Sequence, residues 1–391
     1  MGASVFLLFR TNIMLKVFEA FAGYGSQRMA LRNSGIPHEV VGISEIVEDA
    51  ILAYAAIHTD LLSDSDGWPP QLSDSEMVGY LESVNVPLDY KTFENRARLL
   101  KKDALRLLYR ANRLAKNFGD IKRIVPETLP DFDLFTYSFP CQDISVAGYQ
   151  RGLDSDSGTR SSLLWECCKI IETKRPRYLM MENVKNLVGT NHRRNFSEFL
   201  RYLEKLGYTN CWNILNARDF GVPQNRERVF CISSLDADFA FKFPNPVILR
   251  KSMSDMLEPS APERLYLKNG TLESPITQKV CYCIDSNYWK GSTLENFLTK
   301  RRRQLVTDGS RAGNGSFRVR RLTTKEAWRL MGCSDSDFEK AAAVVSSTGL
   351  YKLAGNSIVV AVLEAVFRSL FLGGTAEDFS EIKRRHQLTL F

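Results

Sequence analysis

The sequence predicts an α/β fold with an open sheet, and three apolar strands carry this prediction. The first strand, residues 15–22, is followed by a glycine turn and then by a helical pattern at 27–33. This order begins many nucleotide-binding units, because glycines let backbone amides approach the ligand. Residues 39–45 and 47–58 read as a second strand and helix, and 133–137 as a third strand.

Length and composition set the broad class. The 391 residues are 44% hydrophobic and 25% charged, which is ordinary for a soluble globular protein of about two or three domains. No apolar run approaches the roughly 18 residues that span a membrane, so we expect no membrane anchor and no targeting signal. The 8 cysteines lack paired Cys-x-x-Cys spacings, so we expect no bound metal and reduced thiols. Either Met1 or Met14, which stands just before the first strand, is the candidate start.

Cys141 is the candidate nucleophile. It follows Pro140, which ends the third strand because proline cannot donate to a sheet ladder. The thiol therefore leaves the sheet at its carboxyl edge, where open α/β sheets bind ligands. Sulfur attacks as a thiolate and is strongly nucleophilic near neutral pH. The alternative is that Cys141 packs as a small apolar residue, and residues 139–142 alone do not decide between the two.

Two carboxylates stand at predicted strand ends. Glu45 closes the second strand, where a carboxylate commonly holds a ribose diol; a lone carboxylate there would otherwise cap the next helix. Glu182 follows the buried strand 177–181, which we expect beside the strand that leads to Cys141. Because this strand end lies at the ligand edge of the sheet, Glu182 is a candidate acid.

Two further stretches place polar residues where a ligand could bind. Arg226 and Arg228 are two residues apart, so on a strand they share one face; the alternative is an exposed salt-bridge ladder with Glu227 turned the other way. Residues 355–357, Gly-Asn-Ser, precede an apolar helix at 358–370. A glycine and two small polar residues before a helix predict a second ligand site made of backbone amides.

Basic residues concentrate in two regions. Apolar residues recur at alternating spacings of four and three between Phe93 and Phe118, which predicts one long helix whose other face is basic. Residues 239–315 are irregular, which predicts a second domain, and 236–320 carries 14 Lys+Arg against 9 Asp+Glu. Each region is either an ordinary solvated surface or a contact for the phosphates of a polyanion, and charge alone does not separate these alternatives.

Five motifs occur in a characteristic order along the chain. They are Phe-Ala-Gly-Tyr-Gly-Ser at 21–26, Phe-Pro-Cys-Gln at 139–142, Glu-Asn-Val at 182–184, Gln-Asn-Arg-Glu-Arg at 224–228 and Gly-Asn-Ser at 355–357. In this order they resemble the DNA (cytosine-5)-methyltransferase family, and the resemblance extends from Phe18 to Phe367. Two departures are mild: Glu19 stands where the family commonly has Asp, and Ser26 where many members have Gly.

The resemblance implies methyl transfer from S-adenosylmethionine to C5 of a cytosine that is flipped out of double-stranded DNA. Cys141 would add to C6 and make C5 nucleophilic, and loss of the C5 proton would then release the thiol. Glu182 would hold N3 as a protonated acid, which requires a raised pKa, and Arg228 would hold O2. Arg226 would support the loop or the thiolate. The implied catalytic set also contains Gln142 and Ser145.

The resemblance also implies a site for S-adenosylmethionine. Phe21, Gly23 and Gly25 would face its methionine part, and Glu45 would hold the ribose hydroxyls. The other implied cofactor residues are Ile46 at the adenine face, Asp120 at the adenine amino group, Ile121 beside it, Pro140, and Leu163, Asn356 and Ser357 at the amino-acid end.

The implied architecture is α/β, a Rossmann-like S-adenosylmethionine-dependent methyltransferase domain with a smaller, irregular target-recognition domain. We predict a catalytic domain at 1–238 with a helical insertion at about 61–118, a target-recognition domain at 239–345, and a return to the catalytic domain at 346–391. The loop 142–158 should close over the DNA. The candidate DNA-reading residues are Ser310, Arg311 and Asn314.

Other interpretations stay open beside this one. One alternative substrate is transfer RNA, and two alternative classes are a DNA-binding protein with an inactive core and a nicotinamide-dependent oxidoreductase, which Arg28 in place of a third turn glycine disfavours. We expect a monomer that acts on double-stranded DNA in the cytoplasm or nucleoid of a bacterial or virus-infected cell. A separate restriction endonuclease is a candidate partner, and the short recognition domain favours a short target such as CG or GC.

Overall fold

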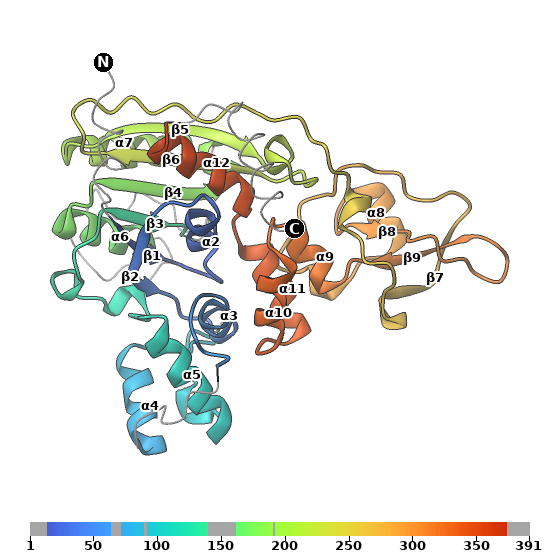
Figure 1. Cartoon of the computed structure of the whole chain (residues 1–391), viewed down its shortest axis with the longest axis horizontal. Coiled ribbons are helices and arrows are strands. Elements are labelled where there is room, and N and C mark those ends of the chain that lie inside the picture. Colours follow the sequence, from blue (N-terminus) through green and yellow to red (C-terminus); the bar gives the residue numbers. More distant parts are fainter. Residues whose placement is uncertain (1–13, 64–71, 90–91, 140–161, 191, 374–391) are drawn as a thin grey trace. The chain divides into compact units, whose positions relative to one another are not determined.

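The computed structural model describes residues 14–63, 72–89, 92–139, 162–190 and 192–373, which fall into two compact units. Unit 1 takes in the described residues within 1–215, 227–245 and 363–391. Unit 2 comprises residues 216–226 and 246–362. Each unit is built on a sheet of its own (Figure 1).

A six-stranded sheet forms the centre of unit 1, in the order β2-β1-β3-β4-β6-β5. Its strands are β1 (Leu15–Ala20), β2 (His38–Ser44), β3 (Leu134–Tyr137), β4 (Tyr178–Val184), β5 (Thr209–Asn216) and β6 (Glu227–Ser234). Strands β1 to β4 run parallel, whereas β6 pairs antiparallel with β4. The carboxyl ends of the four parallel strands therefore meet at one edge, where such sheets bind ligands. The predicted α/β class is confirmed.

Aromatic side chains fill the core of unit 1. The rings of Phe18 and Phe135 lie 6.0 Å apart and those of Phe135 and Tyr137 lie 5.0 Å apart, and all three are buried. Rings of this size dominate core energetics and hold the strand ends in place. The helices of this unit are α2 (Ser26–Asn33), α3 (Glu48–His58), α4 (Asp74–Ser83), α5 (Lys102–Leu114), α6 (Ser162–Lys174) and α7 (Arg193–Lys205). Its 3-10 turns are η1 (Ala97–Leu99), η2 (Ile121–Arg123), η3 (Pro126–Thr128) and η6 (Lys185–Val188).

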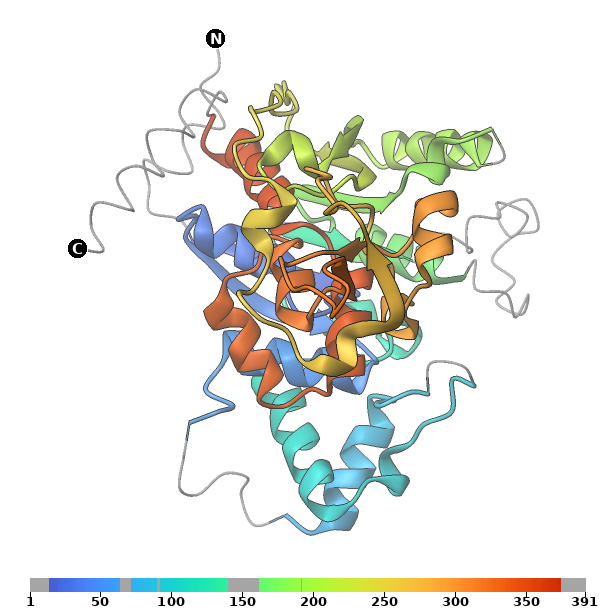
Figure 2. The same cartoon turned by 90° about the vertical axis from the view of Figure 1, so that its right-hand side faces the viewer.

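The insertion between α3 and β3 contains a shorter helix than the sequence predicts. Helix α5 spans Lys102–Leu114, and left-handed φ angles occur on either side of it, 57° at Phe93 and 51° at Lys116. The prediction of one helix from Phe93 to Phe118 is therefore wrong at both ends, because Leu100 and Lys101 are extended before the helix and Lys116 is left-handed after it, and apolar spacing does not register such breaks. Helices α4 and α5 pack side by side (Figure 2).

Basic side chains of the insertion pair with acidic residues of unit 1. Arg98 Nε lies 2.6 Å from Glu82 Oε1, and Lys116 Nζ lies 2.9 Å from Glu39 Oε1. Exposed ion pairs of this kind contribute little stability. They nevertheless give each of these basic side chains an acidic partner within the chain. The contacts favour the solvated-surface interpretation of this basic region over contact with phosphates.

Unit 2 has a small antiparallel sheet in the order β7-β9-β8. Its strands are β7 (Tyr266–Leu272), β8 (Leu305–Val306) and β9 (Phe317–Arg321). Its helices are α8 (Leu294–Lys300), α9 (Thr324–Arg329), α10 (Asp335–Ala342) and α11 (Ser347–Asn356). Its 3-10 turns are η7 (Ala217–Phe220), η8 (Met253–Met256), η9 (Glu263–Leu265) and η10 (Tyr288–Lys290). Helix α12 (Val360–Phe371) begins in unit 2 and continues into unit 1.

One helical stretch in the described part of the chain, 347–371, is long and apolar enough to cross a membrane. It comprises α11 and α12, which Ser357 separates in an extended conformation. Its most apolar window is 67% buried, as in the core helices of globular proteins.

The borders of the two units differ from the predicted domain borders at 238 and 345. Unit 2 takes in residues 216–226, which precede β6, and also helix α11. Compactness and function are separate properties, so the division into a catalytic and a target-recognition domain stays a prediction.

Candidate active site

The turn after β1 is tight and depends on glycine, as predicted. Gly23 and Gly25 have left-handed φ angles of 56° and 81°, and a Cβ on Gly25 would lie 2.4 Å from His58 Nε2. The amide of Phe21, whose own φ is 56°, donates to Ser44 O at 2.8 Å and ties the turn to the end of β2. Non-glycine residues rarely adopt this φ, and such strained residues cluster at ligand sites.

Glu45 lies against this turn. Its carboxylate accepts hydrogen bonds from the backbone amides of Gly23 (2.9 Å), Ile46 (2.8 Å) and Val47 (2.9 Å). Burial raises the pKa of Glu45, and these amide donors oppose the shift. The structure thus brings together three predicted cofactor residues, Gly23, Glu45 and Ile46. The capping alternative accounts for the contacts to Ile46 and Val47, and ribose binding stays a prediction.

Residues 117–121 lie beside the end of β2 despite the long insertion that precedes them. Ser44 Oγ donates to Gly119 O at 2.7 Å, and Asn117 Oδ1 accepts from Glu45 N at 3.0 Å. Asn117 Nδ2 also donates to Glu45 O at 2.9 Å. Asn117 therefore joins two predicted parts of the cofactor site. Sequence reasoning missed it, because no motif marks an asparagine whose partner lies 72 residues earlier.

Asp120 and Ile121 stand at the start of η2. The Asp120 carboxylate accepts from Asn85 Nδ2 at 2.8 Å and from Lys122 N at 3.1 Å. Ile121 is buried in the main core of unit 1, and Leu163 of α6 packs against that same core. These contacts fix the three side chains within unit 1, and their contact with adenine or with an amino-acid group stays a prediction.

Two buried oxygens at the ligand edge have no hydrogen-bond partner among the described residues. They are Glu19 Oε1 on β1 and Thr136 Oγ1 on β3, at directly paired positions of the two strands. The second carboxylate oxygen of Glu19 accepts from Tyr54 OH at 2.7 Å. Buried polar atoms are normally satisfied, so this edge fits a ligand group that donates hydrogen bonds, such as an ammonium, or ordered water.

The predicted nucleophile Cys141 lies outside the described residues, as do Pro140, Gln142, Ser145 and the loop 142–158. The chain that leads to it is described as far as Phe139, which is buried. Its carbonyl accepts from Asn183 Nδ2 at 2.8 Å. Asn183 is the middle residue of the Glu-Asn-Val motif, so this motif ties the chain two residues before Cys141 to the strand that carries Glu182.

Five of the described cysteines are poor nucleophiles. A thiol reacts as its thiolate, so a raised pKa lowers its reactivity at neutral pH. Burial raises the thiol pKa of Cys167, Cys168, Cys211, Cys231 and Cys281. None of these five thiols competes with Cys141 as the candidate nucleophile.

Glu182 and Arg228 form an ion pair at the carboxyl end of β4. Arg228 Nε lies 3.3 Å from Glu182 Oε1, and the two side chains are 17% and 8% exposed. Antiparallel pairing of β4 with β6 places Val184 opposite Arg228 and Glu182 opposite Phe230. Strand pairing therefore brings the predicted acid and the predicted guanidinium clamp together. A carboxyl and a guanidinium at one sheet edge can donate hydrogen bonds to a flat ring that presents adjacent acceptors.

Arg226 does not share a face with Arg228. Strand β6 begins at Glu227, so Arg226 precedes the strand and belongs to unit 2. Its buried guanidinium donates to backbone carbonyls, among them Gly355 O at 3.0 Å and Ser357 O at 2.6 Å. The prediction of a shared face is wrong, because the strand starts one residue later than the alternation assumed. A role of Arg226 at the thiolate stays a prediction.

The Gly-Asn-Ser motif lies at the end of α11 in unit 2. Asn356 is the last residue of the helix, and the amide of Ser357 donates to Ala354 O at 3.4 Å. A Cβ on Gly355 would lie 2.2 Å from the carbonyl carbon of Asp285, so only glycine allows this close approach. The motif therefore ends one helix as well as preceding the next, and ligand binding by its amides stays a prediction.

The candidate DNA-reading residues Ser310, Arg311 and Asn314 lie in one hairpin of unit 2. Arg311 and Phe317 form an antiparallel bridge across it. Arg311 and Asn314 are exposed, and Asn314 Oδ1 accepts from Ser316 N at 3.1 Å. A guanidinium and an amide on an exposed hairpin are groups that read base edges. Contact with DNA stays a prediction.

Comparisons with known proteins agree with this geometry. A family model described as C-5 cytosine-specific DNA methylase matches residues 72–372. The chain is 62% identical over 359 residues to the Type II methyltransferase M2.ScrFI of Lactococcus lactis subsp. cremoris, covering 92% of this chain and 99% of that protein. It is 33% identical over 377 residues to the orphan methyltransferase M.SssI of Spiroplasma monobiae, covering 90% and 96%. The solved S. pombe Dnmt2 methyltransferase aligns over 92% of this chain and 98% of its own, with a TM-score of 0.59 and 20% identity, which indicates a shared fold.

Proposed function

Because this chain belongs to the C-5 cytosine-specific DNA methylase family and is a DNA (cytosine-5)-methyltransferase, we propose that it acts on a flipped-out cytosine in double-stranded DNA through a covalent bond between Cys141 and C6. The observation that carries the proposal is the position of the two side chains at one sheet edge, where Arg228 Nε lies 3.3 Å from Glu182 Oε1. Cytosine presents two adjacent acceptors, N3 and O2. A protonated Glu182 would donate to N3 and Arg228 to O2, so the pair is complementary to that edge of the base.

The proposed chemistry makes C5 nucleophilic before it is methylated. The Cys141 thiolate forms a bond to C6, and the electron pair of the C5=C6 bond moves towards N3. Glu182 supplies a proton at N3, while Arg228 offsets negative charge at O2. C5 then carries the reactive electron pair. After methylation, N3 returns its proton to Glu182, the C5 proton is lost to a base, and cleavage of the bond between sulfur and C6 restores the aromatic ring.

The described residues at the sheet edge fit S-adenosylmethionine. When bound, it supplies an electrophilic methyl group on its sulfonium. We assign the turn at Gly23 and Gly25 to its methionine part, and the orphaned oxygens of Glu19 and Thr136 are suitable acceptors for its ammonium. Glu45 would accept from the ribose hydroxyls in exchange for part of its present amide contacts. The adenine would be held by Asp120, Ile121 and Ile46, and the amino-acid end also by Phe21, Pro140, Leu163, Asn356 and Ser357.

The biological setting follows from the relatives. The relative at 62% identity is a Type II methyltransferase, so restriction–modification is the supported context. We propose that the chain acts as a monomer on cellular DNA in the cytoplasm. A cognate endonuclease acting separately at the same sequence is the proposed partner, and a short target such as CG or GC is the proposed site.

Covalent trapping tests the mechanism. Full-length protein is incubated with S-adenosylmethionine and duplexes that contain 5-fluorocytosine in randomised flanks. Fluorine cannot leave C5 as a cation, so the ring cannot be restored and a protein–DNA bond should accumulate. We expect a denaturant-resistant complex with the natural chain and none with Cys141→Ser. Cys211→Ser, at a half-buried site on β5, is the matched control and should still be trapped.

Two results would contradict the proposal. The first is a Cys141→Ser variant that methylates duplex DNA at the rate of the natural chain, because the hydroxyl is a far weaker nucleophile than the thiolate. The second is methyl label that enters transfer RNA alone when duplex DNA and transfer RNA are offered together. Sequencing of the trapped duplexes would identify the target sequence.

A further inference from the structure

We propose that Asp308 is a positioning residue for DNA sequence selection: it anchors the hairpin 308–318 and thereby holds Arg311 for contact with the major-groove edge of a guanine. We call residues 308–318 the reading hairpin. The proposal rests on the function proposed above, because it assumes that unit 2 inspects duplex DNA. All residues that carry it belong to unit 2.

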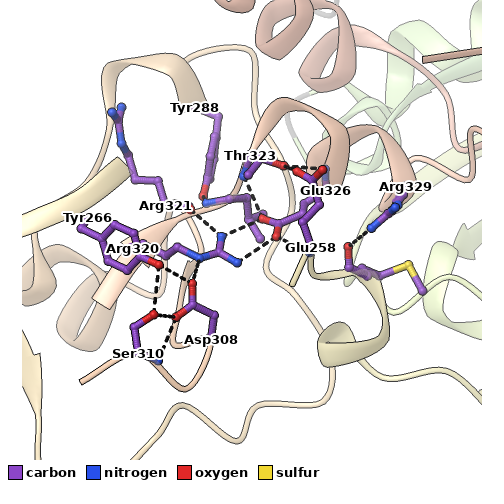
Figure 3. Close-up of polar contacts among 12 residues, drawn as sticks. Glu258, Tyr266, Tyr288, Asp308, Ser310, Arg320, Arg321, Thr323, Glu326 and Arg329 are labelled. Carbon is purple, nitrogen blue, oxygen red and sulfur yellow. Dashed lines mark hydrogen bonds and ion pairs between the residues drawn. The ribbon is translucent and has the colours of Figure 1, made fainter. Parts of the chain in front are cut away.

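The anchor begins with a buried arginine on β9. The Arg320 side chain is 0% exposed, and its charge is met by two carboxylates. Nε donates to Asp308 Oδ2 at 2.5 Å, and Nη2 and Nη1 donate to Glu326 Oε1 and Oε2, each at 2.9 Å (Figure 3). A buried guanidinium is costly unless its N–H groups are hydrogen-bonded and its charge is paired. If Asp308 moved away, Nε of the buried Arg320 would lose its hydrogen-bond acceptor.

Asp308 connects this arginine to the first residues of the reading hairpin. Its Oδ1 accepts from the amide of Ser310 at 3.1 Å and from the Ser310 hydroxyl at 2.6 Å. Its Oδ2 accepts from Tyr266 OH of β7 at 2.6 Å as well as from Arg320 (Figure 3). Burial alone would raise the pKa of Asp308, but hydrogen bonds from Ser310, Tyr266 and Arg320 hold it well below its usual value. One ionised carboxylate therefore fixes the hairpin to two strands.

The reading hairpin itself is ordered by backbone hydrogen bonds. Arg318 N donates to Ser310 O, Ala312 N donates to Ser316 O, and Gly315 N donates to Ala312 O, each at 2.9 Å. These bonds set the register of the two arms, and the contacts of Asp308 fix the first arm to the sheet. A register fixed at the base determines which side chains stand at the exposed end.

Arg311 is held in one orientation on this hairpin. Its Cζ lies 4.0 Å from the centroid of the Phe317 ring, and Nη1 donates to Gly315 O at 2.6 Å. Within the described residues these are its side-chain contacts, and the residue is exposed, so its remaining N–H donors are open to a ligand. A guanidinium that is already ordered loses little entropy on binding. Bidentate donation from arginine to O6 and N7 of guanine is the commonest specific contact in the major groove.

The test measures selectivity, so partial unfolding does not imitate the result. Each full-length variant methylates a random-sequence duplex library, and sequencing gives the ratio of the rate at the preferred target to the rates at targets that differ by one base pair. We expect Arg311→Ala to lower this ratio about 5- to 150-fold at one guanine position, because a base-specific contact is lost. Asp308→Asn should lower the ratio at that same position by about tenfold or more. The double variant should be no less selective than Arg311→Ala alone, since Asp308 acts through Arg311.

A mild variant and a matched control complete the experiment. Tyr266→Phe removes one hydroxyl donor to Asp308, and a smaller loss of selectivity at the same position is expected. Asp335→Asn removes a carboxylate that pairs with Arg329 at 2.6 Å, also in unit 2 but away from the reading hairpin, and the ratio should stay within about twofold of the natural chain.

The outcomes separate this inference from the proposed function. The inference is overturned if Asp308→Asn lowers the methylation rate equally at all sequences. It is also overturned if the losses of selectivity caused by Asp308→Asn and Arg311→Ala multiply in the double variant, because Asp308 would then not act through Arg311. If the natural chain methylates no duplex DNA, the proposed function itself fails. Methylation by the natural chain together with loss of selectivity in both single variants supports the inference.

Discussion

The two units use arginine–carboxylate pairs in different ways. In unit 1, Glu182 and Arg228 are joined at 3.3 Å at a sheet edge, and both side chains retain some exposure. In unit 2, Arg320 is fully buried and contacts both Asp308 and Glu326, with the Glu326 contact bidentate at 2.9 Å. The first arrangement leaves 17% of the arginine side chain exposed, whereas in the second the arginine is 0% exposed and its two carboxylates are 4% and 0% exposed.

This difference in exposure suits the two pairs to different roles. The Glu182–Arg228 pair can interact with a substrate, whereas the contacts of Arg320 stabilise the fold. A buried charge contributes to a stable structure only when every hydrogen-bonding atom is satisfied, and then it cannot change partners without a large cost. A partly exposed pair at a sheet edge is less constrained and can donate to a base that enters the site. Breaking the two pairs should therefore affect different measurements, stability in unit 2 and rate in unit 1.

Removal of Glu326 should have the largest effect on stability. Glu326→Ala would leave Arg320 buried with one of its two carboxylates missing, and loss of a partner from a buried pair typically costs about 3–5 kcal/mol. We expect a decrease of that size in the free energy of unfolding of the full-length chain, measured by urea denaturation. The control is Glu339→Ala, whose carboxylate pairs with Lys325 on the surface at 65% exposure, and which should change the free energy by less than about 1 kcal/mol. If the two variants lowered the free energy of unfolding equally, the contacts of Arg320 would not be a special source of stability in unit 2.

Removal of the acid at Glu182 should instead reduce the rate. Glu182→Gln keeps the shape of the side chain but cannot supply a proton to N3, so kcat should fall about 100- to 1,000-fold while the free energy of unfolding changes little. The measurement is kcat for steady-state methylation at saturating duplex DNA, with the single-turnover rate and duplex affinity determined in parallel. Glu227→Gln is the matched control, because Glu227 adjoins Arg228 and pairs with the exposed Lys185 at 2.9 Å. A fall in kcat that is the same for both variants would argue against a specific role of Glu182.

The strand ends of unit 1 could be predicted because their signals are local. Apolar runs ended by glycine, proline or an acidic residue mark both the strands and the edge at which their polar residues meet, as Glu45 and Glu182 illustrate. The tight turn at Gly25 was predictable for the same reason, since a glycine between a strand and a helix commonly marks a backbone with a positive φ.

Contacts between distant segments could not be predicted in this way. Asn117 and Glu45 are 72 residues apart, and Asp308 meets Tyr266 from 42 residues away. No spacing in the sequence distinguishes these residues from ordinary surface asparagines and aspartates. Their roles arise from tertiary packing, which local propensity does not encode.

Two predictions of local structure were wrong for a physical reason that can be named. The apolar period between Phe93 and Phe118 is genuine, but the extended residues Leu100 and Lys101 precede the helix and the left-handed Lys116 follows it. The spacing of Arg226 and Arg228 would place both on one face if the strand contained both, and the antiparallel ladder with β4 begins only after Arg226. In each case tertiary context overrode the periodicity.

A fourth carboxylate extends the comparison, because Glu19 is fully buried and accepts a hydrogen bond from a hydroxyl rather than from a guanidinium. Burial raises its pKa to about 7, and hydrogen bonding from Tyr54 and the charge of Arg28 oppose the shift. The folded chain therefore binds the proton more tightly than the unfolded chain, whose carboxyl has its ordinary pKa of 4.5. The stability from this group is fully present below pH 4.5 and is lost as the pH rises to about 7.

Replacement of Glu19 should flatten the pH dependence of stability. The shift in the pKa of Glu19 corresponds to about 3 kcal/mol of stability that the natural chain loses between pH 4.5 and 7.5. Glu19→Gln has no such carboxyl group, so its free energy of unfolding, relative to that of the natural chain, should rise by about the same amount over this pH range. Tyr54→Phe provides the opposite test, because loss of the hydroxyl donor should raise the pKa of Glu19 further and extend the loss of stability to higher pH. A pH profile of Glu19→Gln parallel to that of the natural chain would mean that Glu19 is ionised in the folded protein. Some other charge or solvent would then have to offset the cost of burying the ionised carboxylate.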